Sequence, residues 1–164
     1  MSNADAVDRI VGQWNVERPE LDTEPMEILG RMNRITRAVG DRQEAAYGRL
    51  GIGRGEFDVL ATLRRSGEPY VLSPKELAAS TMLTTGGMTG RLDKLERMGL
   101  IGRSPDPYDR RGLRVGLTDR GRAIVDEAVV AGLEAQSAVL AGLSAADRRR
   151  LAALLRDVLA AADS

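Results

Sequence analysis

The sequence predicts a mainly α-helical protein with one small β-hairpin, and three observations carry this prediction. Apolar residues recur at helical spacing over most of the 164 residues. After Gly99 that spacing gives way to the alternation of apolar and polar residues that is typical of strands. Capping residues and glycines mark where the helices should begin and end. Together these patterns predict long helices on both sides of a compact central region.

Two helices are expected in the first fifty residues. The first ends near Arg18-Pro19, because proline disfavours the helical conformation of the residue before it. The second begins after Asp22 or Thr23 and runs toward Gly51, which is roughly seven turns at the usual helical pitch. The first helix carries one apolar stripe at helical spacing, formed by Val7, Ile10, Val11 and Trp14.

Three helices are expected in the central region. The first spans 54–65 and buries an apolar face before Ser66-Gly67. The second begins at Pro74, because the sequence 73–76 combines an N-cap serine, a proline at the first helical position and a glutamate three residues after the cap. It has room for about two turns before the turn at 80–83. Thr84 or Thr85 is then expected to cap a third helix that ends before Gly99.

A hairpin and two further helices complete the chain. A strand should run from Leu100 to near Ser104, and a polar turn should occupy 105–112. The returning strand covers 113–117, where apolar and other residues alternate. Thr118 is expected to cap a long helix, and Ser144 with an acidic residue three positions later is expected to cap the last one. The order helix, turn, helix, hairpin is that of a winged helix-turn-helix with flanking helices.

Composition excludes several classes of function. The chain has no cysteine and no histidine, so disulfides, Cys/His zinc sites and catalysis by a Cys or His base are excluded. We expect no catalytic residues, no metal and no cofactor. No run of 18 uncharged apolar residues and no signal-peptide pattern appears, so a cytoplasmic protein without membrane contact is expected. The net charge is zero, but 86–114 holds seven basic and four acidic side chains. This local excess favours contact with phosphates.

The hairpin and the helix before it resemble the MarR family of bacterial transcription regulators. The family's wing carries an acid, a nearby arginine, a glycine at its tip and a closing Leu-Thr, which match Asp109, Arg111, Gly112, Leu117 and Thr118. The stretch 84–89, followed by 91–96, is similar to the family's recognition helix. The resemblance covers nearly the whole chain. It implies a winged helix-turn-helix regulator that binds double-stranded DNA as a homodimer and responds to a small molecule.

The candidate DNA contacts come from the recognition helix and the wing. Short hydrogen-bonding side chains and free N–H groups suit the start of a helix that enters the major groove. Arginines at the wing suit phosphates or a narrow minor groove. Two structural alternatives stay open: a frayed helix start, and an Asp109–Arg111 ion pair that only shapes the hairpin. The candidate contacts are Thr84, Thr85, Gly87, Thr89, Arg91, Lys94, Arg110 and Arg111.

The flanking helices are expected to mediate dimerisation. Residues 1–50 and 119–164 carry long apolar faces that the DNA-binding domain, 51–118, is too small to cover. A homodimer is the simplest solution. Its twofold symmetry predicts a pseudo-palindromic operator whose half-sites lie about one turn of DNA apart.

A possible effector site comes from a narrower resemblance. The urate-responsive branch of the family has an added N-terminal helix and a quartet of one tryptophan, one aspartate and two arginines. By position these match Trp14, Asp58, Arg91 and Arg103. Guanidinium groups and an aromatic surface would suit a small anionic or phenolic effector. The alternative is a structural ion pair of Asp58 with either arginine, beside a tryptophan that only fills the dimer core.

These observations predict a ligand-responsive transcription repressor that binds a pseudo-palindromic operator as a homodimer. One alternative is a helical dimer that mediates protein contacts without binding DNA. The third class, an enzyme, is disfavoured because no polar constellation converges in the sequence.

Overall fold

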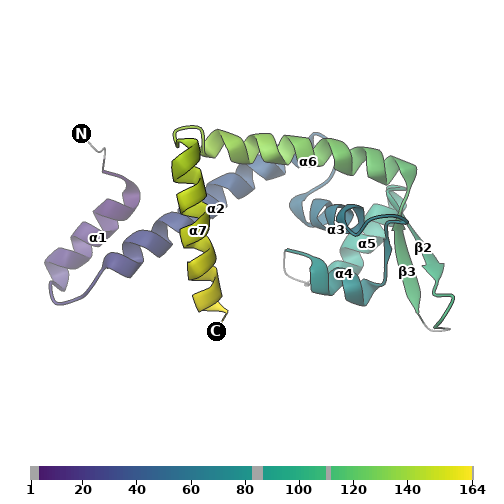
Figure 1. Cartoon of the computed structure of the whole chain (residues 1–164), viewed down its shortest axis with the longest axis horizontal. Coiled ribbons are helices and arrows are strands. Elements are labelled where there is room, and N and C mark those ends of the chain that lie inside the picture. Colours follow the sequence, from purple (N-terminus) through teal and green to yellow (C-terminus); the bar gives the residue numbers. More distant parts are fainter. Residues whose placement is uncertain (1–3, 83–86, 110–111, 164) are drawn as a thin grey trace. The chain divides into compact units, whose positions relative to one another are not determined.

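The computed structural model describes residues 4–82, 87–109 and 112–163. The chain forms two compact units, Met1–Arg42 and Gln43–Ser164, and each is described by itself. Figure 1 shows the elements in chain order. The helices are α1 (Ala6–Glu17), α2 (Glu24–Gly48), α3 (Arg54–Arg65), α4 (Pro74–Ser80), α5 (Met88–Arg97), α6 (Asp119–Val139) and α7 (Ala145–Ala162), and the strands are β1 (Val71–Leu72), β2 (Ile101–Pro105) and β3 (Leu113–Leu117).

In the first unit, α1 is defined by strong local signals at both ends. The Asp5 carboxylate accepts hydrogen bonds from the N–H groups of Val7 and Asp8 at 2.6 and 3.0 Å, which is the capping that a helix start requires. Asp8 closes the capping box by accepting from the Asp5 N–H at 2.8 Å. At the other end the Arg18 N–H bonds to the carbonyl of Trp14, and a proline follows. The helix therefore ends where the sequence predicts.

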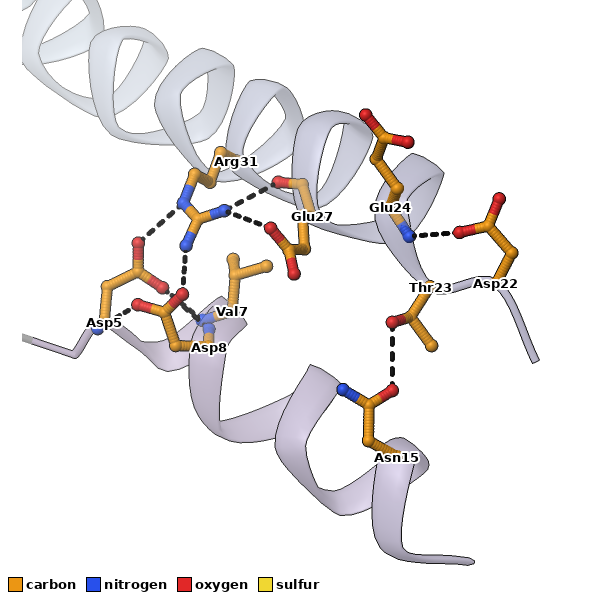
Figure 2. A network of polar contacts seen from close by, with 9 residues as sticks. All are labelled: Asp5, Val7, Asp8, Asn15, Asp22, Thr23, Glu24, Glu27 and Arg31. Carbon is orange, nitrogen blue, oxygen red and sulfur yellow. Dashed lines mark hydrogen bonds and ion pairs between the residues drawn. The ribbon is translucent and has the colours of Figure 1, made fainter. Parts of the chain in front are cut away.

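Arg31 of α2 joins the two helices of this unit. Its Nε lies 2.9 Å from a carboxylate oxygen of Asp5, and its Nη2 pairs with Asp8 (Figure 2). Its Nη1 is 3.8 Å from the carboxylate of Glu27, one turn earlier on α2. Asp5 therefore caps α1 and also receives Arg31, so the start of α1 and its contact with α2 share one carboxylate.

The second unit is built around α3. Its residues Val59, Leu60 and Leu63 are fully buried. They belong to a core that also takes apolar side chains from α4, α5, α6 and the sheet. Its span is the one that the sequence predicts. Because α3 contacts both α5 and α6, a displacement of α3 at its contact with α6 can also move α5.

A three-stranded antiparallel sheet in the order β1-β3-β2 closes the second unit. The β2–β3 hairpin is the predicted one, and it pairs Ile101 with Leu117 and Pro105 with Leu113. Strand β1, which pairs only Val71 and Leu72 with β3, was not predicted from the sequence. Two residues are too few to show an alternating pattern. This edge strand fixes the start of α4 beside the sheet, because it leads directly into that helix.

One helix start differs from the prediction. The N-cap of α5 is Gly87, with a φ of 79°, and not Thr84 or Thr85. A positive φ favours glycine over residues with a side chain, so the chain turns into the helix at this point. Thr84 and Thr85 lie outside the described residues. The other predicted caps, Thr118 for α6 and Ser144 for α7, are confirmed by hydrogen bonds to the expected N–H groups.

Candidate nucleic-acid interface

The capping box predicted at the start of α4 is present. The Glu76 N–H donates to Ser73 Oγ at 3.2 Å, and the Ser73 N–H donates to Glu76 Oε2 at 2.7 Å. Pro74 occupies the first helical position. These contacts lower the pKa of the Glu76 carboxyl, with the N–H of Ser73 as the largest cause. The helix start is therefore fixed, and the seven-residue α4 gives the predicted two turns.

The start of α5 is uncovered, whereas its opposite face is anchored in the core. Leu92 and Leu95 are buried. Thr89 and Gly90 are exposed, and a Cβ added to Gly90 would meet nothing within 4 Å. Gly87 provides no side-chain cap for the first turn. The exposed first turn therefore offers N–H groups and the positive end of the helix dipole to an approaching phosphate.

The two basic candidates of α5 lie against α3. Lys94 Nζ is 3.3 Å from the carboxylate of Glu56. The Arg91 side chain covers Gly55, since a Cβ at that glycine would lie 2.5 Å from Arg91 Nε. Both candidates thus orient α5 on α3 in the free protein. Their contact with DNA stays a prediction.

The loop between β2 and β3 is closed by its own backbone and by one aspartate. The Asp106 N–H donates to the carbonyl of Gly112 at 2.9 Å, and the Gly112 N–H donates to the carbonyl of Asp109 at 2.9 Å. The Tyr108 N–H donates to the Asp106 carboxylate at 2.9 Å, and the Tyr108 side chain is 93% exposed. Arg110 and Arg111, the predicted wing contacts, lie outside the described residues. The alternative prediction, an Asp109–Arg111 ion pair, is untested for the same reason.

Acidic side chains of this region are neutralised within the protein. Arg103 on β2 pairs with Asp93 at 2.6 Å and lies 3.4 Å from Glu96, both on α5. Arg114 on β3 pairs with Asp106 at 2.7 Å. The Tyr108 N–H and then Arg114 hold the pKa of the Asp106 carboxyl below its ordinary value. Arg103 and Arg114 thus hold three acidic side chains of this region in ion pairs within the protein.

The structure brings part of the predicted effector quartet into one unit. Asp58 on α3 is buried and accepts a hydrogen bond from the Met82 N–H at 3.1 Å. Arg91 and Arg103 belong to the same unit, and the ion pairs of Arg103 described above run to α5. Trp14 belongs to the first unit, where its side chain is 43% exposed. The quartet stays a prediction.

The second unit contains a cavity of about 410 Å³ that was not predicted from the sequence. Its walls come from α2, α3 and α6, with Met82 beside them. Two of its lining residues, Tyr47 and Phe57, stack on each other, with ring centroids 4.3 Å apart. Arg64 lines the cavity, pairs with Asp126 at 2.8 Å and lies over the ring of Tyr70. Small residues such as Ala61 and Gly132 indicate a cavity only when the fold is known to bring them close to aromatic side chains. The spacing of residues along the sequence therefore could not reveal this cavity.

A helix-turn-helix pair followed by a hairpin defines a winged helix DNA-binding protein. The family can also be stated. A sequence profile of the MarR family matches residues 50–112. The transcriptional regulator PecS of Dickeya dadantii is 37% identical over 149 residues, which cover 91% of this chain and 90% of PecS. The chain belongs to the MarR family of transcription regulators and binds DNA.

Solved structures agree with this assignment. A mutant of MarR from Escherichia coli in complex with operator DNA has a TM-score of 0.70 and 27% identity, and the match covers 89% of this chain and 97% of that one. BpsR of Bordetella bronchiseptica, whose DNA binding is regulated by 6-hydroxynicotinic acid, has a TM-score of 0.62 and 27% identity. That match covers 78% of this chain and 98% of BpsR. None of the described helices is long and apolar enough to cross a membrane.

Proposed function

We propose that the protein is a repressor that binds a pseudo-palindromic operator as a homodimer and is released from it by a small aromatic acid. The observation that carries this proposal is the cavity between α3 and α6, because α3 also packs against the recognition helix α5. A ligand in that cavity touches the support of α5 without competing for the DNA surface.

The homodimer is supported by apolar faces that the single chain leaves uncovered. The helix α7 spans Ala145–Ala162 and has no buried residue, although four leucines and one valine recur along it at helical spacing. Leu154 and Leu159 are 55% and 62% exposed. Apolar faces of this length mark a contact with another chain. A second copy is the simplest partner, because twofold symmetry covers the same face on both chains.

The chemistry of the cavity favours a flat, partly anionic ligand. Its lining is mainly apolar and aromatic and includes Tyr47, Phe57, Val125 and Val129. Arg64 and Arg65 are the two cationic side chains among its lining residues. An aromatic ring would fill the apolar part, and a carboxylate would pair with a guanidinium. The ligand named for BpsR has this chemistry.

A short path leads from the cavity to α5. Met82 lines the cavity, and its N–H is held by the buried carboxylate of Asp58 on α3. Met82 also precedes the segment that leads into α5. A ligand that displaces α3 thus acts on the helix against which the recognition helix packs. The effector need only bind the DNA-free arrangement more tightly than the DNA-bound one.

The effector proposal is tested by titrating 6-hydroxynicotinic acid, salicylate and urate against the complex of the protein with its operator. Substituting Ala61→Leu fills the cavity from α3. We expect an aromatic acid to release DNA from the wild type, and we expect Ala61→Leu to bind DNA normally but to lose the response. If release persists in Ala61→Leu, the ligand binds elsewhere.

The second candidate for the effector site is the quartet of Trp14, Asp58, Arg91 and Arg103. It is favoured by the buried carboxylate of Asp58, which already holds the Met82 N–H. The variants Trp14→Phe and Arg103→Ala separate the two sites. Loss of the urate response in these variants, with an unchanged response in Ala61→Leu, would support the quartet and the urate-responsive branch.

A further inference from the structure

The hairpin and α4 are joined by an arginine that the DNA-binding surface described above does not use. Arg114 lies on β3, next to the last residue pair that joins β1 and β3, Leu72 with Val115. Its Nε is 2.7 Å from Asp106 Oδ2, and its Nη1 is 3.3 Å from Glu76 Oε2. The arginine therefore continues the connection between the hairpin and α4 where the backbone pairing ends.

Both carboxylates already have a structural task. Glu76 closes the capping box of α4 by accepting the Ser73 N–H. Asp106 accepts the Tyr108 N–H and so shapes the loop between β2 and β3. The Asp106 side chain is only 11% exposed, and the Arg114 side chain is 31% exposed. A single guanidinium thus links the start of α4 to the turn of the loop.

The contact between loop and helix is polar. A cleft of about 490 Å³ lies between the start of α4 and the loop, and most of its lining residues are polar or charged. Glu76, Asp106 and Arg114 are among them. The ion pair of Arg114 with Glu76 crosses this cleft and therefore contributes to the orientation of the loop on α4.

We propose that Arg114 is a positioning residue for DNA binding, which orients the loop 106–112 relative to α4 through Asp106 and Glu76. The proposal rests on the predicted wing contact with DNA by Arg110 and Arg111, two residues of the same loop that lie outside the described residues. In the free protein the guanidinium of Arg114 pairs with two carboxylates. Its role is to keep the loop at the angle at which hairpin and helix-turn-helix contact one duplex together.

The rival explanation is that Arg114 binds a phosphate directly, and the two explanations predict opposite signs. The variants Glu76→Gln and Asp106→Asn each remove one negative charge near the DNA and release Arg114 from one partner. A phosphate contact predicts tighter binding in both variants. A positioning role predicts weaker binding, by about threefold to tenfold. Gln keeps the capping function at its helix position, and Asn keeps an oxygen for the Tyr108 N–H.

The experiment measures operator affinity at several salt concentrations for the wild type, both variants and Arg110→Ala. The matched control is Glu127→Gln, an exposed acid of α6 without a hydrogen bond or ion pair to the described residues. Thermal unfolding checks that each variant is folded. Hydrogen exchange of 105–113 in the free protein provides a second measure, and we expect it to become faster in Glu76→Gln and Asp106→Asn but not in the control.

The outcomes separate the two proposals. Weaker binding and faster exchange in both acid variants, beside weaker binding of Arg110→Ala, support the positioning role. Unchanged or tighter binding of the acid variants, with Arg110→Ala still weak, overturns the positioning role and keeps the wing contact. No effect of any of the three substitutions overturns both.

Discussion

At the scale of single residues, two aspartate carboxylates each accept hydrogen bonds both from a nearby backbone N–H and from an arginine on another element. Asp5 caps α1 and receives Arg31, and Asp106 shapes the loop and receives Arg114. The sequence shows such an acid as a helix cap or a turn residue, because both signals are local. The second partner lies 26 residues away for Asp5 and 8 residues away for Asp106. The contact with the arginine therefore depends on the fold and cannot be predicted from the local sequence.

The Arg31 cluster predicts a local effect of substitution. In Arg31→Met the two acids at the start of α1 lose their cationic partner, so we expect faster hydrogen exchange across α1 and no change in α3. The matched control is Arg34→Met, an exposed arginine of α2 without an ion pair to the described residues. Equal exchange in both variants would show that the cluster does not hold α1.

The same cluster predicts a dependence on pH. The pKa of the Asp5 carboxyl is below its ordinary value, first because the Asp8 N–H donates to it and then because of Arg31. A depressed pKa stabilises the folded form above the ordinary value of an aspartate, and this contribution is lost as the pH falls through the lowered value. Exchange of α1 should rise there in the wild type. Asp5→Asn, which keeps the cap, should lack this step.

At the scale of elements, glycines decide where helices approach other surfaces. Gly121 lets α6 pass the start of β2, since a Cβ there would lie 1.9 Å from the Leu100 carbonyl oxygen. Gly90 is different, because its side of α5 is open in the free protein. The sequence shows both as helix-weakening residues, and only the structure separates the packed glycine from the exposed one.

Gly90→Ala is expected to separate stability from DNA binding. Alanine favours the helix by roughly 1 kcal/mol relative to glycine, so thermal unfolding should occur at a higher temperature. If the start of α5 enters the major groove, the added methyl group should weaken operator binding. Gly142→Ala, outside the helices and also in open space, serves as the control for DNA affinity. Unchanged affinity in Gly90→Ala would place the groove contact elsewhere.

Gly121→Ala is expected to destabilise the second unit. The added carbon overlaps backbone that cannot move without displacing β2, and such overpacking costs about 1–3 kcal/mol. Thermal or denaturant unfolding measures the loss. An unfolding midpoint equal to that of the wild type would mean that α6 shifts freely on the sheet.

At the scale of the whole molecule, the sequence was sufficient for the family and for most helix boundaries. Capping signals and apolar periodicity are local, so α3, α4, α6 and α7 begin where they were expected. The cavity lined by Tyr47 and the link through Arg114 were not predicted, because each joins residues from separate elements. The start of α5 was also misplaced, since the choice between a threonine cap and a glycine with positive φ depends on the preceding turn.

The proposed dimer makes a prediction at this scale. Leu154→Asp places a charge on the exposed apolar face of α7 without touching the core. We expect sedimentation to show a monomer and operator affinity to fall by orders of magnitude, because each half-site then binds alone. Asp157→Asn on the same helix provides a control. A dimeric Leu154→Asp variant would show that α7 is not the interface.

The internal pairing of acids around α5 and the hairpin also has a consequence for the search for an operator. With Asp93, Glu96 and Asp106 held by arginines and a net charge of zero on the chain, we expect the attraction to DNA to be short in range. Such a protein gains little from unspecific phosphate contacts elsewhere on its surface. It should leave unrelated DNA quickly, so that few molecules are held away from the operator in a genome with many competing sites.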